Sequence, residues 1–170
     1  MDSISKAKLD YYEQRINDWS ASLAKSHEGG HFLPNEELYW TPLDKPIEEC
    51  TIALVSSAGV HLRSQEAFDL LEPLGDPTIR EIPGDVDSTE LMASHAHVDT
   101  VPANEDINCV FPIDRLREFS EVGRIGKVAS THYGLMGFCP PVERMRDEVG
   151  TQIAKQLHEE GVDAVLLVAG

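Results

Sequence analysis

Two histidines and an aspartate lie at alternate positions in the segment His95-Ala-His97-Val-Asp99. On an extended chain, alternate side chains point to one side, so these three groups could share a metal ion. The other interpretation is a solvated or substrate-facing loop, in which the imidazoles contact a ligand directly. We favour the second interpretation, with His95 and His97 as substrate-binding residues and Asp99 as a third ligand in the metal-binding alternative.

Polar residues also follow two predicted strands. His61 and Arg63 come after an apolar strand over 51–56 and the small-residue turn at 57–59, and His132 comes after a predicted strand over 125–130. In open α/β sheets, ligands gather just beyond the carboxyl ends of the strands. We therefore expect Arg63 to bind a carboxylate and His61 and His132 to act as catalytic proton carriers. A structural role remains the alternative for each.

The composition excludes several classes of function. Fourteen Lys and Arg residues stand against 30 Asp and Glu, a net charge of -16, which repels a phosphate backbone and argues against nucleic-acid binding. No apolar run approaches the ~20 residues of a membrane span, and the N-terminus lacks the apolar core of a signal peptide. We expect a cytoplasmic protein. The three cysteines form no Cys-x-x-Cys pair, which argues against a zinc ribbon.

Strands and helices alternate along the chain. Short apolar runs predict strands over 51–56, 78–82, 125–130 and 165–168, and the last of these reads as a buried parallel strand. Amphipathic patterns predict helices over 112–122 and 140–160. This order indicates an α/β fold with an open, mainly parallel sheet and helices on both faces.

The N-terminal region has a different pattern. Apolar residues recur at three- to five-residue spacing over 3–25 and predict an amphipathic helical arm. We expect residues 1–46 to form this helix and a connector, and residues 47–170 to form the α/β domain. Because ligands gather beyond strand ends, and the sequence stops after its last strand, we expect that domain to be incomplete at its C-terminal end.

Several segments, taken in order, resemble one known family. The chain resembles the selenoprotein B subunit family of glycine/sarcosine/betaine reductase and D-proline reductase over roughly residues 51 to 170. The segments that carry the resemblance are Ala53-Leu-Val-Ser-Ser-Ala-Gly59-Val-His61-Leu-Arg63, Arg80-Glu-Ile-Pro83-Gly-Asp85, Ser94-His95-Ala-His97-Val-Asp99, Asp106-Ile-Asn108-Cys-Val-Phe111-Pro112-Ile-Asp-Arg115-Leu, Gly126-Lys-Val-Ala-Ser-Thr-His132-Tyr133-Gly-Leu-Met-Gly137 and Gly161-Val-Asp-Ala-Val-Leu-Leu.

The resemblance implies an oxidoreductase subunit that cleaves a C–N bond in glycine, sarcosine, betaine, D-proline or a related amine, with a dithiol as electron donor. It implies no cofactor within these 170 residues and a selenocysteine or cysteine just after Gly170. We expect codon 171 to be UGA, or the chain to have been cut at this boundary. The expected partners are a small amino-acid-like substrate and other reductase subunits or the chain itself, because an exposed last strand tends to pair with another chain.

Two other functions remain open at this stage. One is a metal-dependent hydrolase or lyase that uses His95, His97 and Asp99. The other is a non-catalytic assembly subunit that docks through the N-terminal helix.

Overall fold

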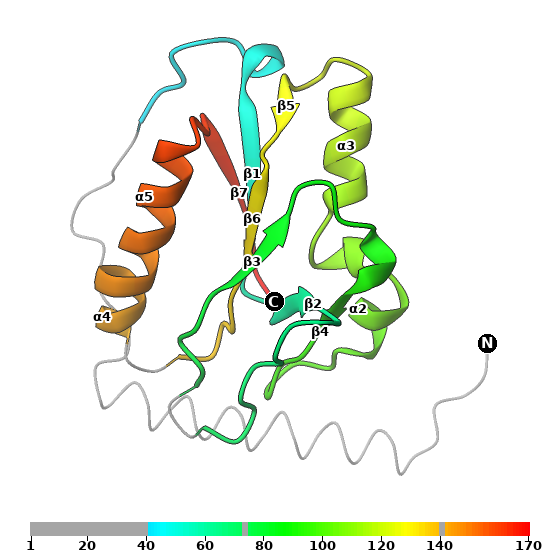
Figure 1. Ribbon diagram of the computed structural model, residues 1–170, viewed down its shortest axis with the longest axis vertical. Helices are drawn as coiled ribbons and strands as arrows, with labels where there is room; N and C mark the ends of the chain where they lie inside the picture. The colour runs from blue at the N-terminus through cyan, green and yellow to red at the C-terminus, as the bar shows by residue number, and fades with distance from the viewer. Residues whose placement is uncertain (1–40, 73–74, 140–141) are drawn as a thin grey trace, which may run out of the picture. The chain divides into compact units, whose positions relative to one another are not determined.

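The computed structural model describes residues 41–72, 75–139 and 142–170 of the protein. Strands and helices alternate through these residues, as Figure 1 shows. The strands are β1 (Thr51–Ser56), β2 (Val60–Leu62), β3 (Arg80–Pro83), β4 (Leu91–Ala93), β5 (Lys127–Val128), β6 (Thr131–Gly134) and β7 (Ala164–Val168). The helices are α2 (Val101–Glu105), α3 (Ile113–Glu121), α4 (Val142–Arg144) and α5 (Thr151–Glu159), with short 3-10 turns at Ile47–Glu49, Ser88–Glu90 and Ile107–Cys109.

The main sheet is built around β1. β7 pairs with β1 in parallel along one edge, and β5 and then β6 pair with β1 in parallel along the other. β3 pairs antiparallel with the far edge of β6, and β2 and β4 form a separate antiparallel ribbon. Helix α5 lies on one side of the sheet and α3 and α2 on the other (Figure 1). The predicted open, mainly parallel α/β fold with helices on both faces is therefore confirmed.

Alternation along β1 gives the sheet two buried faces. Ile52 and Leu54 pack into the core shared with α2 and α3, whereas Ala53 and Val55 pack against α5. Successive strand residues point to opposite faces, so a strand covered on both sides is apolar throughout. The four central residues of β1, Ile52 to Val55, therefore form a continuous apolar run, and the predicted strand has the same bounds as the observed one.

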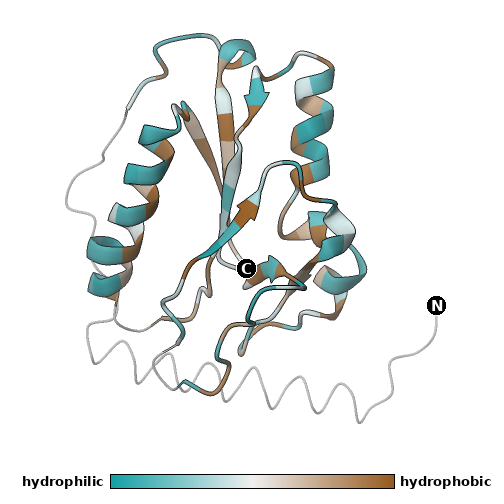
Figure 2. Cartoon of the chain, in the orientation of Figure 1, coloured by the Kyte–Doolittle hydropathy of each residue, from teal (hydrophilic) through white to brown (hydrophobic). Residues whose placement is uncertain are grey.

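A π-helical segment (Met145–Gly150) joins α4 to α5 into one continuous helix. Its apolar stripe repeats every four residues, at Met145, Val149, Ile153 and Leu157. Four residues of a regular α-helix turn by about 400°, so this stripe would drift by about 40° at each step. The wider π turn reduces the drift near the start of the helix. Figure 2 shows the apolar side of α5 turned toward the sheet.

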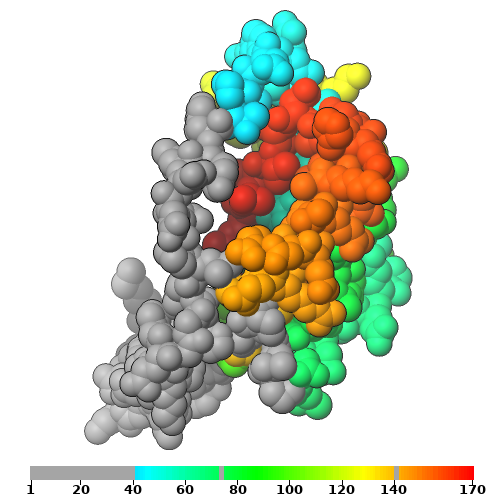
Figure 3. Space-filling view, turned by 90° about the vertical axis from the view of Figure 1, so that its left-hand side faces the viewer, coloured from blue at the N-terminus to red at the C-terminus, as the bar shows by residue number. Residues whose placement is uncertain are grey.

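The structure corrects two of the predicted strands. The segment predicted as one strand over 125–130 contains only β5, and His132 lies inside β6 rather than in the loop after a strand. The predicted last strand is present and parallel, but the prediction that it is buried was wrong. Val165, Leu166 and Leu167 are 40, 44 and 74% exposed, and β7 lies at the edge of the sheet. Figure 3 shows β7 in red at the surface beside α5 in orange.

Two further expectations concern the N-terminal region and membranes. The predicted helical arm over 3–25 lies outside the described residues, and the division between residues 46 and 47 stays a prediction. In the described parts of the chain, no helix has the length and apolar character needed to cross a membrane.

Candidate functional site at the carboxyl edge of the sheet

The segments that follow β1, β6 and β7 meet at the carboxyl edge of the sheet. The backbone N–H of Gly59 donates to the carbonyl of Leu135 at 2.8 Å, and the N–H of Gly137 donates to the carbonyl of Ser57 at 2.8 Å. The N–H of Gly170 donates to Ser57 Oγ at 3.2 Å. These hydrogen bonds gather three chain segments at the place where open α/β sheets bind their ligands.

Gly59 brings a fourth segment to this edge. Its φ is +71°, a left-handed conformation that favours glycine, and a Cβ atom here would lie 2.0 Å from the carbonyl oxygen of Ser94. The N–H of Ser94 donates to the carbonyl of Gly59 at 2.9 Å. The loop after β4, which carries His95 and His97, is thereby fixed next to the end of β1.

His61 holds the start of that loop. Its buried ring lies with Nδ1 2.8 Å from the carbonyl of Leu62 and Nε2 3.0 Å from Ser94 Oγ. A carbonyl only accepts, so Nδ1 carries the proton, and the neutral ring accepts the Ser94 hydroxyl at Nε2. Burial, with smaller effects of Arg80 and Arg63, lowers the pKa of His61. His61 is therefore neutral near pH 7 and positions the hydroxyl of Ser94.

His95 offers an unused hydrogen-bond donor. Its Nδ1 accepts the backbone N–H of His97 at 3.1 Å, so the proton of the neutral ring is on Nε2. That atom is buried and has no hydrogen-bond partner among the described residues. Burial, and to a smaller extent His97, lowers the pKa of His95. A neutral imidazole with a free N–H can donate to a carboxylate oxygen of a ligand.

His97 is exposed and lies next to the imidazole of His95. Its ring packs against Phe138 from the loop after β6, with 4.0 Å between the ring centroids, and lies 6.4 Å from the ring of His95. Histidine is the side chain that most often transfers protons in enzymes. The arrangement thus places one buried and one exposed imidazole at the same edge of the sheet.

The geometry does not favour the metal-binding alternative. Residues 96–98 bend rather than extend, so the expectation that alternate side chains share one side was wrong. Asp99 Oδ1 accepts the backbone N–H of Val101 at 3.1 Å, at the start of α2. Within residues 41–72, 75–139 and 142–170, no three His, Cys, Asp or Glu side chains are grouped so that they could hold a metal ion.

Arg63 lies away from the histidine loop. Its backbone N–H donates to the carbonyl of Glu90 and its Nε donates to the carbonyl of Thr89, each near 2.9 Å. Both contacts are at the end of the β2–β4 ribbon opposite Ser94. The exposed guanidinium is therefore not placed beside His95 and His97, although all three residues were expected to contact a ligand.

His132 is part of the sheet. The side chain is fully buried, and its Nδ1 accepts the backbone N–H of Leu54 at 2.9 Å. Leu54 lies on β1 between the residues that pair with β5 and those that pair with β6. Its ring makes an edge contact with Phe111, with 6.0 Å between centroids. Burial, with a smaller effect of Arg117, lowers the pKa of His132 to about 4. The imidazole supplies an acceptor that β1 would otherwise lack.

The structure thus groups three of the five predicted site residues, His61, His95 and His97, and separates Arg63 and His132 from them. It adds Ser94 and Phe138, which sequence reasoning did not select. Ser94 directly precedes His95, but a single serine after a short strand carries no recognisable signal. Phe138 lies more than 40 residues from its partner His97, so no local pattern links the two.

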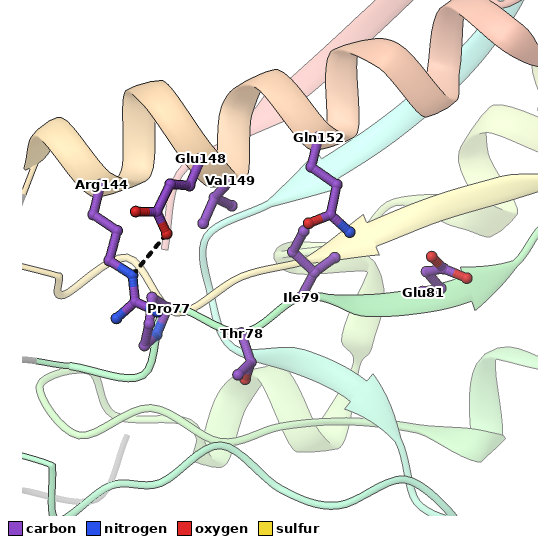
Figure 4. Close-up of a pocket in the computed structure, with 8 residues that line it drawn as sticks. All are labelled: Pro77, Thr78, Ile79, Glu81, Arg144, Glu148, Val149 and Gln152. Atoms are coloured by element: carbon purple, nitrogen blue, oxygen red, sulfur yellow. Dashed lines mark hydrogen bonds and ion pairs between the residues drawn. The ribbon is translucent and has the colours of Figure 1, made fainter.

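A cavity of about 500 Å³ lies elsewhere, between the segment leading into β3 and the α4–α5 helix (Figure 4). On its helix side Arg144 Nε and Glu148 Oε2 form an ion pair at 3.1 Å. None of the five predicted site residues lines it. The lining residues are Pro77, Thr78, Ile79, Glu81, Arg144, Glu148, Val149 and Gln152.

Comparisons with known proteins give similar sequences but no similar solved structure. The chain is 44% identical over 131 residues to the D-proline reductase subunit gamma of Acetoanaerobium sticklandii, covering 77% of this chain and 53% of that protein. It is 33% identical over 133 residues to the glycine reductase complex component B subunit gamma of Carboxydothermus hydrogenoformans, covering 75% of this chain and 30% of that protein. No solved structure matches significantly.

A third relative is the betaine reductase complex component B subunit beta of Peptoclostridium acidaminophilum, 29% identical over 131 residues. The chain spans about half the length of the D-proline reductase subunit and less than a third of the glycine and betaine reductase subunits. Residues 36–170 match the family model described as glycine/sarcosine/betaine reductase selenoprotein B. The resemblance found in the sequence is confirmed, and the chain belongs to the glycine/sarcosine/betaine reductase selenoprotein B family.

Proposed function

We propose that this chain is part of a reductase that cleaves a C–N bond in a small amino acid, with a dithiol as electron donor. The dithiol is oxidised to a disulfide, and its two electrons and two protons form a new C–H bond and a new N–H bond where the C–N bond was. D-proline is the first substrate to test, because the 44% identity to a D-proline reductase subunit exceeds the 33% identity to a glycine reductase subunit.

The observation that carries this proposal is the position of Gly170. Its N–H is bonded to Ser57 Oγ, and a Cβ atom on Gly170 would lie 2.3 Å from Ala58 Cα, so the backbone rests directly on the turn after β1. We propose a selenocysteine or cysteine immediately after Gly170, at this edge. A selenolate is ionised at neutral pH and attacks soft electrophilic centres, and a thiol can regenerate it by exchange.

The residues of this chain would bind and orient the substrate. The free Nε2–H of His95 would donate to the substrate carboxylate, and the exposed His97 would supply the proton that the leaving amine requires. His61 would act through Ser94, whose hydroxyl it holds at 3.0 Å. Arg63 and His132 lie apart from this group, so we assign them no contact with substrate.

The proposal is tested first on the gene and then on the enzyme. The codons after Gly170 should include UGA or a cysteine codon, followed by an open reading frame. The chain extended through that frame, assembled with its partner subunits, should oxidise dithiothreitol in a D-proline-dependent reaction. Replacing the selenocysteine or cysteine by alanine should abolish the reaction.

A matched pair of histidine variants tests the site itself. His97→Ala should lower kcat/KM by about 100-fold, the usual contribution of a positioned proton donor. His158→Ala, an exposed histidine on α5, serves as the control and should leave kcat/KM unchanged. Equal activities of the two variants would remove His97 from the mechanism. A downstream frame without selenocysteine or cysteine would refute the proposal as a whole.

A further inference from the structure

Asp76 and Arg80 form a largely buried ion pair at the start of β3, and the reaction proposed above uses neither. Arg80 Nη2 lies 3.7 Å from Asp76 Oδ2, and the two side chains are 12 and 9% exposed. Thr78 joins them, because its hydroxyl donates to Asp76 Oδ1 and accepts a hydrogen bond from Arg80 Nη1 at 2.6 Å. Both charges are thus paired and hydrogen-bonded, as burial requires.

The guanidinium of Arg80 fixes a segment that follows β2. Its Nε donates to the carbonyl of Glu66 at 2.8 Å, and its Nη2 donates to the carbonyl of Ala67 at 3.2 Å. Its central carbon lies 4.3 Å from the centroid of the buried Phe68 ring, a cation–π contact. A planar guanidinium can make both bonds and the ring contact at once, so Arg80 sets the position of Phe68.

Phe68 in turn contacts an imidazole of the candidate site. Its ring meets that of His61 edge to face, with 6.0 Å between the centroids and 75° between the planes. His61 holds Ser94 Oγ at 3.0 Å, and Ser94 directly precedes His95. A first series of contacts therefore leads from Arg80 to the histidine loop.

The carboxylate of Asp76 fixes two stretches of backbone. Its Oδ2 accepts the N–H of Asp69 at 2.9 Å, and its Oδ1 accepts the N–H of Thr78 at 2.8 Å. Burial by itself would raise the pKa of Asp76, but the hydrogen bonds from Thr78 and Asp69 and the charge of Arg80 together lower it. The carboxylate is therefore ionised at neutral pH, the state in which both oxygens accept hydrogen bonds.

Gly75 connects Asp76 to the other side of the site. Its φ is +73°, a left-handed conformation that favours glycine, and a Cβ atom here would overlap the carbonyl oxygen of Phe138. The backbone directly before Asp76 thus packs on Phe138, whose ring centroid lies 4.0 Å from that of His97. A second series of contacts leads from Asp76 to the exposed imidazole.

We propose that Asp76 and Arg80 are positioning residues of the reductase, which act through two aromatic rings on two imidazoles of the candidate site. The ring and imidazole pairs are Phe68 with His61 and Phe138 with His97. Functional side chains keep their geometry when packing and hydrogen bonds from neighbouring residues hold them in place. The inference rests on the proposed function, because it concerns imidazoles that act on the substrate.

NMR spectra of the 170-residue chain, labelled at histidine, test the positioning without any activity. Arg80→Lys keeps the charge but loses the planar fork. It should move the imidazole resonances of both His61 and His97, because the ring currents of the two phenyl groups act on the neighbouring imidazoles. Phe68→Leu and Phe138→Leu give the direction of displacement expected for each resonance.

Two further variants make this test specific. Arg117→Lys is the matched control, because Arg117 also donates to backbone carbonyls and forms an ion pair, but on α3. It should leave both resonances in place even where it lowers stability as much as Arg80→Lys. Thr78→Val removes, at an exposed position, the hydroxyl that joins the pair. It should cause the same displacements in smaller size, and it keeps the test decisive if Arg80→Lys does not fold.

The activity of the extended chain, assembled with its partner subunits, tests the consequence for the reaction. A shift of about 1 Å in a catalytic group can cost about 100-fold in rate. Arg80→Lys should therefore lower kcat/KM for D-proline-dependent oxidation of dithiothreitol by about tenfold or more. Arg117→Lys should leave kcat/KM unchanged.

Three results would overturn the proposal. The first is that the resonances of His61 and His97 stay in place in both Arg80→Lys and Thr78→Val. The second is that Arg117→Lys moves them equally, which would indicate a general loosening of the fold. The third is an active reductase in which Arg80→Lys displaces the resonances but leaves kcat/KM unchanged. A wild type without reductase activity would instead refute the proposed function, and the spectra would still decide whether the ion pair positions the imidazoles.

Discussion

Replacing His132 by leucine tests whether the fold needs this buried side chain as a hydrogen-bond acceptor. Transfer of a more apolar side chain into the core would by itself stabilise the fold. The structure predicts the opposite sign, because leucine cannot accept the N–H of Leu54 that His132 Nδ1 now accepts at 2.9 Å. A buried donor left without a partner costs about 1–3 kcal/mol. We therefore expect His132→Leu to lower the free energy of unfolding by about 1–3 kcal/mol at pH 7.5.

The same variant has a defined pH dependence. The pKa of His132 is about 4 in the folded protein, below the ordinary value of 6.5, so the unfolded chain binds the proton more readily. Stability from the neutral ring is full above about pH 6.5 and is lost as the pH falls toward 4. By pH 5 the wild type should lose about 2 kcal/mol that His132→Leu does not lose. His61 and His95 titrate in both proteins, so their contributions cancel in the difference.

Urea denaturation at pH 7.5, 6 and 5 measures both effects, and amide hydrogen exchange at Leu54 gives a local readout. The stability difference between the two proteins should shrink as the pH falls, and the Leu54 amide should exchange faster in the variant. A leucine variant as stable as the wild type at pH 7.5, or a difference that stays constant down to pH 5, would refute the assignment of His132 as a neutral acceptor in the sheet.

Three further substitutions test local packing in the fold. Gly59→Ala should lower the free energy of unfolding by more than about 2 kcal/mol, since a Cβ would lie 2.0 Å from the Ser94 carbonyl oxygen, whereas Gly123→Ala, with a similar φ of +70° and open space around it, should cost only about 1 kcal/mol. Equal losses in urea denaturation would show that the Gly59–Ser94 contact is not tight. Tyr133→Phe should be neutral or stabilise by up to about 1 kcal/mol, because its buried hydroxyl has no hydrogen-bond partner among the described residues and burial raises its pKa to about 12. A loss above about 1 kcal/mol in thermal unfolding would reveal a partner for that hydroxyl.

The sequence alone determined the elements whose signal is local. β1 follows from six consecutive small or apolar residues, and the α4–α5 helix follows from an apolar stripe that repeats every four residues. The motifs also determined the family, because together they extend over more than 100 residues of the chain, and residues 36–170 match the family model. The histidine loop was found for a similar reason, since His95 and His97 are neighbours in the sequence.

Only the tertiary structure decided those features that depend on contacts between segments far apart in the sequence. An apolar run predicts a strand but not its place in the sheet, so β7 was expected to be buried and is instead an exposed edge. A histidine near a strand is compatible with catalysis or with structure, and only the approach of Leu54, 78 residues away, gives His132 its structural hydrogen bond. Likewise, Arg63 lies only two residues from His61 in the sequence. In the structure, Arg63 lies at the end of the β2–β4 ribbon opposite Ser94, which is the residue that His61 contacts. Strand pairing, rather than distance along the sequence, therefore sets which side chains meet.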